Sequence, residues 1–241
     1  MSKFSILNES SLHKSLKKIY RIQTEGSAEV EKNGHIYDIV SKNGEIIEIQ
    51  NLNLQSLLPK IRDSLERKEK IRLVHPLVLT KTIELRDKNG NLIKKTKSPK
   101  KGVIYDIFNE IKGIYEILLC SNFILEVPEI KITEIRTKED DSVQSKNKKR
   151  RFKKDWNKSD KKLDEIGKIY FFSNAEDYLK LLPESLNEEF SSKDLSKALE
   201  EKKLPSRICK NANLILWVLK HMQLISHVKT ENRAYIYKIN R

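Results

Sequence analysis

Asp38, Glu48 and Gln50 are the residues of this sequence whose types and spacing indicate chemistry. They lie on two short apolar segments that a tight Asn43-Gly44 turn separates. Side chains alternate along a strand, so Glu48 and Gln50 share a face, and Asp38 on a neighbouring antiparallel strand can meet them. Two carboxylates suit Mg²⁺, which keeps several waters beside its protein ligands. The expected chemistry is metal-assisted hydrolysis of a phosphodiester.

An upstream acid is expected to complete this site, and the sequence offers Glu25, Glu29 and Glu31. We prefer Glu29 because of its position. The strands that carry Asp38 and Glu48 look apolar on both faces, as buried central strands do, and a buried carboxylate is costly unless it is paired or bound to metal. The alternative is that both acids are ordinary surface residues of an amphipathic hairpin.

The elements around this hairpin alternate between helix and strand. Apolar residues at helical spacing predict helices, and alternating runs bounded by turn residues predict strands. The expected elements are a helix over 10–20, strands over 28–31, 36–40 and 45–50, a helix over 54–66 and a strand over 71–75. The strand, helix, strand order at its end favours a parallel crossover. The first domain is therefore expected to be α/β, with a mixed sheet flanked by helices.

Residues 10–78 resemble the PD-(D/E)XK, or restriction-endonuclease-like, superfamily. The matching segments are Ile36-Tyr37-Asp38-Ile39-Val40 and Ile46-Ile47-Glu48-Ile49-Gln50. The resemblance implies a metal-dependent nuclease core in which Asp38 and Glu48 hold Mg²⁺ (or Mn²⁺). The sequence departs from the pattern because no Pro precedes Asp38 and because Gln50 stands where a Lys is usual. Gln50 can orient the attacking water but brings no positive charge.

The middle of the chain combines a second hairpin with a strongly basic segment. The hairpin spans 80–85 and 92–96, residues 103–118 look helical, and 122–137 look extended, so the first domain is expected to cover 1–137. Residues 138–165 contain many Lys and Arg, including Arg150 and Arg151, and few apolar residues besides Phe152 and Trp156. We expect a flexible linker there, either simply solvated or serving as a strap along DNA.

Residues 166–241 have the pattern of a small α+β winged helix-turn-helix domain. Ser191 and Asp194 form the sequence signature of a capping box. A second helix is expected over 205–222, followed by a hairpin of 224–229 and 234–239. If the second helix enters the major groove, the residues expected to contact bases are Arg207, Lys210, Asn211 and Asn213, with Lys229 and Arg233 at the backbone. Winged helices also serve as protein-docking modules, and that alternative stays open.

Composition points to an acidic partner. The 241 residues include 48 Lys and Arg against 34 Asp and Glu, a formal net charge of +14. Nucleic acid is the commonest partner of such a protein, although a Lys-rich organism would give the same bias. Cys120 and Cys209 stand far apart and indicate neither a zinc site nor a disulfide framework. No membrane span or signal peptide is visible, so the expected location is cytoplasmic.

Taken together, these features predict a Mg²⁺-dependent DNA endonuclease that a C-terminal winged helix directs to double-stranded DNA. A second interpretation is a non-catalytic DNA-binding regulator with a degenerate nuclease-like domain, which the absent Lys at position 50 permits. A third is a protein-interaction module with a generally basic surface. A homodimer is left open in each case.

Overall fold

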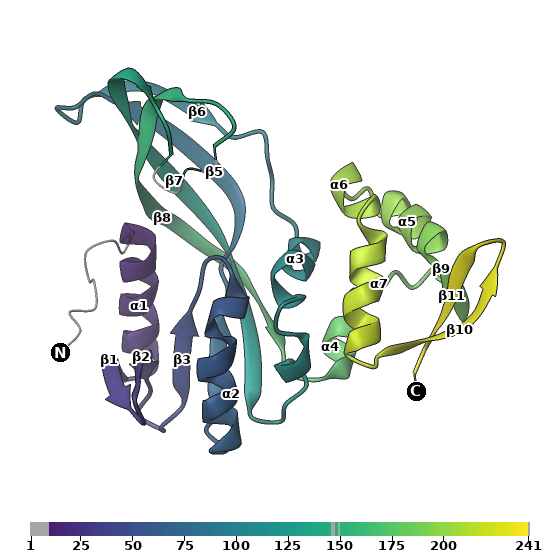
Figure 1. The fold of residues 1–241 in the computed structure, drawn as a ribbon. Coiled ribbons are helices and arrows are strands. Elements are labelled where there is room, and N and C mark those ends of the chain that lie inside the picture. Colours follow the sequence, from purple (N-terminus) through teal and green to yellow (C-terminus); the bar gives the residue numbers. More distant parts are fainter. Residues whose placement is uncertain (1–9, 146–147, 149, 241) are drawn as a thin grey trace. The chain divides into compact units, whose positions relative to one another are not determined.

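A computed structural model describes residues 10–145, 148 and 150–240 (Figure 1). The chain divides into two compact units. Unit 1 comprises residues 1–43, 76–103 and 128–169, and unit 2 comprises 44–75, 104–127 and 170–241. Strands β1 to β8 belong to a mixed parallel and antiparallel sheet, and β9 to β11 form a smaller second sheet. The expected class, a mixed α/β sheet with helices, is confirmed.

The N-terminal helix of unit 1 forms as its apolar spacing predicts. Helix α1 (Ser11–Gln23) begins where the Ser10 side chain accepts a hydrogen bond from the backbone amide of His13. Leu12, Leu16 and Tyr20 form its buried face. This face packs against β1 (Ser27–Lys32) and β2 (His35–Val40), which pair antiparallel, and Figure 1 shows the three elements side by side.

The rest of unit 1 is a layer of long strands. Strand β5 (Leu77–Arg86) pairs antiparallel with β6 (Leu92–Lys97) and parallel with β7 (Phe123–Val143). Strand β8 (Lys154–Phe172) pairs with β7. The flexible linker expected over 138–165 is therefore wrong, because its described residues include the end of β7 and most of β8. Lys146 and Lys149 of that segment lie outside the described residues.

Polar and charged side chains join β7 and β8 across this basic segment. Lys131 on β7 binds Glu165 on β8 at 2.7 Å, and Thr133 donates to Asp164 at 2.8 Å. Near the far end of the pair, Asn157 donates to the Glu139 carboxylate at 2.9 Å. Such cross-strand pairs each contribute a few tenths of a kcal/mol to about 1 kcal/mol. They leave no trace in apolar periodicity, so the sequence pattern looks like a linker.

The central strands of unit 2 run parallel around a helical crossover. Strand β3 (Ile46–Ile49) pairs parallel with β4 (Ile71–Val74), and β4 pairs parallel with the start of β7. Between β3 and β4 lie the short helix η2 (Leu54–Leu57) and α2 (Leu58–Glu66), which packs on β4. The expected parallel crossover is confirmed, and all four residues of β3 are buried. Residues 103–118 form three short helices instead of one, namely η3 (Ile104–Ile107), α3 (Phe108–Ile111) and η4 (Tyr115–Ile117).

The last part of unit 2 contains the small sheet and its helices. After α4 (Ala175–Leu179) come β9 (Glu189–Ser191), α5 (Ser192–Glu201), α6 (Ser206–Cys209), α7 (Ala212–His221), β10 (Ile225–Glu231) and β11 (Ala234–Ile239). The capping box of Ser191 and Asp194 forms as predicted. The helix expected over 205–222 is interrupted at Lys210 and Asn211, and the sheet order β10-β11-β9 includes a strand that the sequence pattern missed.

These C-terminal elements do not form a unit of their own, although a separate domain over 166–241 was expected. Helix α7 packs against α3 and η4. Arg207 on α6 binds the Asp106 carboxylate on η3 at 2.9 Å. Trp217 and His221 stack on each other and both meet the ring of Tyr115 edge-on. Apolar and ionic contacts of this kind tie residues 170–241 to 104–127.

None of the described helices is both long and apolar enough to cross a membrane. Both cysteines are free thiols, and Cys209 is buried whereas Cys120 is partly exposed.

Candidate active site

Glu29 and Asp38 lie opposite each other on the hairpin of β1 and β2. Ala28 pairs with Ile39 and Val30 pairs with Tyr37, so the intervening Glu29 stands across from Asp38. Directly opposed residues on antiparallel strands point to the same face and lie within reach of one another. The acid that we preferred upstream of Asp38 is therefore beside it.

A lysine from helix α1 is shared by these two carboxylates. The Lys17 Nζ is 3.2 Å from the Glu29 Oε1 and 3.3 Å from the Asp38 Oδ1. His13, one turn earlier on α1, places its Nε2 3.5 Å from the same Asp38 oxygen. Lys17 is 9% exposed, whereas the side chains of Asp38 and Glu29 are 20% and 54% exposed, so the contact of Lys17 with Asp38 is better shielded from water than its contact with Glu29. The hairpin and α1 thus place the ammonium group of Lys17 between the carboxylates of Glu29 and Asp38.

The other two upstream acids lie elsewhere on the hairpin. Glu25 is exposed and binds Lys42 at 2.6 Å. Glu31 is also exposed and lies near the hairpin turn, where it pairs with Ile36. Among the three acids considered, only Glu29 stands across from Asp38.

The backbone of Glu29 has a conformation that side-chain-bearing residues seldom adopt. Its φ is +54°, in the left-handed region, although the residue lies within a strand. Such a conformation costs of order 1–3 kcal/mol and persists where the surrounding structure imposes it, often at functional sites. At this position it accompanies the placement of the Glu29 carboxylate near Lys17.

The strand of Asp38 is less buried than the sequence indicated. Tyr37 and Ile39 on one side of β2 are buried, whereas on the other side Ile36 is 50% exposed and Asp38 is half-buried beneath Lys17 and His13 of α1. The expectation that both strands are buried on both faces is therefore wrong for β2. Because the exposed residue Ile36 is itself apolar, the sequence of this strand looks apolar on both faces although one of them is partly open to solvent.

Glu48 in unit 2 is a buried carboxylate with a lysine of its own. It is 3% exposed on the central strand β3, and its Oε1 is 2.6 Å from the Lys60 Nζ on α2. The crossover from β3 to β4 brings α2 over this face of the sheet. The ion pair with Lys60 offsets the cost of burying the Glu48 carboxylate. That cost was the reason for which we expected a metal ion beside Glu48.

Gln50 lies one step beyond β3 and uses its main chain to hold a histidine. His75, buried at the end of β4, contacts the Gln50 backbone oxygen through Nδ1 at 2.9 Å. Burial lowers the pKa of His75, so this ring is neutral at physiological pH and donates that hydrogen bond. The Gln50 side chain donates to the Ser56 hydroxyl at 3.3 Å.

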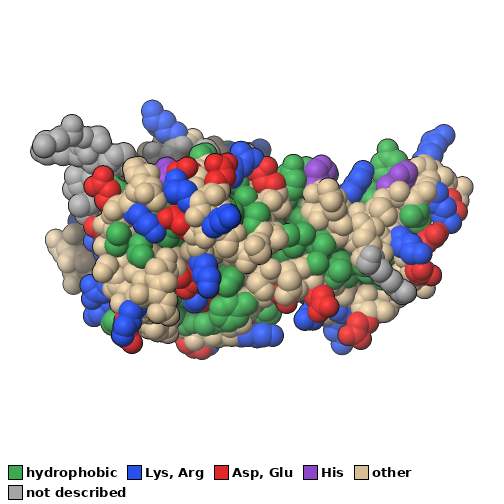
Figure 2. Space-filling model, turned by 90° about the horizontal axis from the view of Figure 1, so that it is seen from below, with side chains coloured by type: hydrophobic (Ala, Val, Ile, Leu, Met, Phe, Trp, Pro, Cys, Tyr) green, Lys and Arg blue, Asp and Glu red, His purple; other side chains and the backbone are tan. Residues whose placement is uncertain are grey.

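The residues expected to contact DNA have different surroundings. Lys210 and Asn213 are exposed, Asn211 is half-buried, and Arg233 is exposed at the turn between β10 and β11. Arg207 is occupied by Asp106, and Lys229 is held by Glu189 at 2.7 Å and Glu231 at 3.0 Å. Arg150 stacks on Trp156, and Arg151 stacks on Phe152. Figure 2 shows Lys and Arg interspersed with Asp and Glu on the face in view, so the basic excess is spread there instead of gathered.

The sequence did not indicate Lys17 and Lys60, which accompany the three candidate carboxylates. Both lie on helices, away from the hairpin segments in sequence, and only the packed structure shows which carboxylate each one binds. In the described part of the chain, no three His, Cys, Asp or Glu residues are grouped closely enough to form a ready metal centre.

The fold and these contacts define a mixed α/β protein with lysine-paired carboxylates on the β1–β2 hairpin at the edge of its large sheet and on the inner strand β3. The chain belongs to the family described as Domain of unknown function (DUF8091), whose model matches residues 10–173. An uncharacterized protein of Treponema pallidum (strain Nichols) is 29% identical over 189 residues, which cover 78% of this chain and 71% of that relative. No solved structure matches the chain.

Proposed function

We propose that this protein is a metal-dependent deoxyribonuclease that hydrolyses phosphodiesters in double-stranded DNA. The observation that carries the proposal is the lysine ammonium shared by Glu29 and Asp38, at 3.2 and 3.3 Å. A position that a side-chain cation holds between two carboxylates has the charge and the oxygen donors that Mg²⁺ or Mn²⁺ takes. The left-handed backbone of Glu29 supports this role.

The residues of the site fit such an ion and have separate tasks in the proposed reaction. Glu29 and Asp38 would hold the metal, which when bound activates water and offsets negative charge on the phosphate. Lys17 stays tethered on α1 beside them, where its positive charge can attract the phosphodiester. His13 contacts Asp38 and orients its carboxylate. Lys17 thus supplies the kind of charge that Gln50 lacks.

Glu48 and Gln50 enter the proposal through the sequence resemblance. The order of elements, α1, β1, β2, β3, α2 and β4, with β3 and β4 parallel, supports a restriction-endonuclease-like arrangement. Within unit 2, the buried carboxylate of Glu48 on the inner strand β3 is neutralised by the ammonium group of Lys60 on α2. Because a structural ion pair has the same geometry, the role of Glu48 needs a test separate from that of Asp38.

A non-catalytic DNA-binding protein is the second candidate, and the C-terminal elements favour it. Strand β9, the helix α5, the interrupted second helix made of α6 and α7, and the hairpin of β10 and β11, to which β9 adds a third strand, follow the order of a winged helix. Lys210, between α6 and α7, and Asn213, on α7, are exposed. However, the bond of Arg207 to Asp106 and the packing of α7 on α3 occupy part of that helix.

Incubation of the full chain with supercoiled plasmid tests both candidates. We expect conversion to nicked or linear DNA with Mg²⁺ or Mn²⁺ and none with EDTA. Gel-shift binding in EDTA is measured on the same preparation. Metal-independent binding with no product under any metal would support the regulator and contradict the nuclease.

A further inference from the structure

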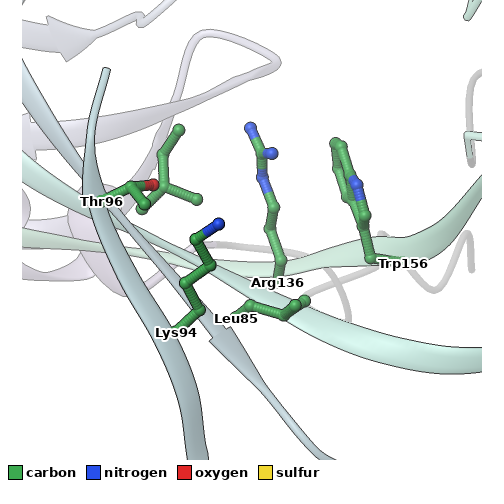
Figure 3. Close-up of a pocket in the computed structure, with 6 residues that line it drawn as sticks. Leu85, Lys94, Thr96, Arg136 and Trp156 are labelled. Carbon is green, nitrogen blue, oxygen red and sulfur yellow. The ribbon is translucent and has the colours of Figure 1, made fainter.

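A cavity of about 210 Å³ opens on the strand layer of unit 1, away from the carboxylate pair. It is lined by Ile83, Leu85, Lys94, Thr96, Arg136 and Trp156 (Figure 3). Leu85 pairs with Lys94 across β5 and β6 and with Arg136 across β5 and β7. The register therefore places an apolar residue between two cations on one face of the sheet. Figure 3 shows the side chains of Arg136 and Trp156 extending side by side.

Arg136 is fixed in place by two contacts. Its guanidinium binds the buried Glu134 carboxylate, with Nη2 and Nε at 2.6 and 2.8 Å from Oε1. The same guanidinium lies 3.8 Å from the centroid of the Trp156 ring, and Arg150 lies 4.2 Å from that centroid. An arginine that is stacked on a ring and held by two hydrogen bonds loses little further side-chain conformational entropy when it binds a ligand.

Positive charge exceeds negative charge around this cavity. The Glu134 Oε2 also lies 3.0 Å from the Lys81 Nζ and 3.3 Å from the Lys158 Nζ. Together with Arg136, three cations therefore surround this one carboxylate. Burial lowers the pKa of Lys161, and the nearby charge of Lys158 lowers it further, as expected in a positive field. Within the described residues, neither Lys94 nor the Nη1 of Arg136 has a hydrogen-bond or ion-pair partner.

We propose that this cavity binds the phosphodiester backbone of a nucleic acid strand, with a phosphate at Lys94 and Arg136 and the sugar or base edge over Ile83 and Leu85. The planar fork of an arginine and a point charge from a lysine both suit phosphate oxygens. The apolar side chains form the floor of a cavity instead of projecting from it, which fits a strand lying in a groove better than insertion into a lipid surface. The choice of nucleic acid rests on the proposed function, but the site lies apart from the carboxylates and needs no metal.

The alternation of β6 offers a matched pair of variants. Lys94 faces the cavity with Thr96, whereas Lys97 belongs to the opposite face and is likewise exposed. Lys94→Gln and Lys97→Gln remove the same charge from the same strand. Thr96→Phe fills the cavity without a change of charge. These variants spare Arg136, whose loss would leave the buried Glu134 without a main partner.

Binding of the full-length variants to a fluorescent DNA strand is measured by anisotropy in EDTA, over a series of salt concentrations. We expect Lys94→Gln to weaken binding about fivefold and to reduce the salt slope by about one. We expect Thr96→Phe to weaken binding and Lys97→Gln to match the wild type. Equal effects of Lys94→Gln and Lys97→Gln would overturn the site, and so would tighter binding to anionic vesicles than to DNA. Because no cleavage is measured, a failed nuclease assay leaves this result interpretable.

Discussion

Replacement of Glu134 by glutamine is expected to lower the free energy of unfolding by about 3–5 kcal/mol, the cost of leaving buried cations without their partner. Glu134 is 1% exposed and receives Lys81, Arg136 and Lys158. Urea unfolding of the two proteins at neutral pH measures the difference. Glu165→Gln is the control, because Glu165 makes an exposed pair with Lys131 on the same strand layer. Its removal should change stability by about 1 kcal/mol or less.

The same carboxylate makes stability depend on pH in a defined direction. Burial alone would raise the pKa of Glu134, but hydrogen bonds from Lys81 and Arg136 bring it from the ordinary 4.5 down to about 2. A lowered pKa contributes stability that is present above the unfolded value and disappears as pH falls toward the folded value. The wild type should therefore lose about 3 kcal/mol between pH 4.5 and 2 through this group. Glu134→Gln should lack that component, and an unchanged acid transition would contradict this assignment.

Asp38→Asn is expected to reduce Mg²⁺-dependent DNA cleavage about a thousandfold, which corresponds to about 4 kcal/mol of lost transition-state stabilisation. The amide keeps the size of the carboxylate but not its charge, so metal affinity and charge compensation at the phosphate both fall. Glu29→Gln should reduce cleavage in the same direction. Initial rates with excess enzyme over plasmid measure the effect for each variant.

Glu25→Gln is the matched control for these variants. Glu25 lies just before the same hairpin, but its carboxylate is exposed and bound to Lys42. Cleavage by Glu25→Gln should equal that of the wild type. Glu48→Gln is measured alongside it, together with the melting temperature. A loss of cleavage with an unchanged melting temperature would assign Glu48 to the reaction, whereas a parallel loss of both would make its bond to Lys60 structural.

The local elements of this fold could be predicted from sequence because their signals are local. The apolar spacing of Leu12, Leu16 and Tyr20 defined α1, and the residues Ser191 and Asp194 defined the start of α5. The parallel crossover from β3 to β4 followed from the order of elements. For α1 and α5 the residues that determine the element stand within a few positions of one another, and the crossover needs only the order of neighbouring elements.

The parts that escaped prediction depend on residues far apart in the chain. Strand β8 pairs with β7, and its charged side chains contact partners on β7, such as Glu165 with Lys131, which no periodicity describes. The C-terminal helices join unit 2 through Arg207 and Asp106, which are 101 positions apart. For the same reason the sequence indicated the acids Asp38 and Glu48 but not the lysines that bind them.

A titration with Mn²⁺, followed by the electron paramagnetic resonance signal of the free ion, tests most directly whether Glu29 and Asp38 form a cation site. The wild type and Glu25→Gln should each remove Mn²⁺ from solution with the same affinity, and excess Mg²⁺ should release it. Asp38→Asn and Glu29→Gln should bind at least tenfold more weakly, because the loss of one carboxylate costs more than about 1.4 kcal/mol. Equal Mn²⁺ binding by the wild type and Asp38→Asn, or no binding by either, would contradict the proposed site.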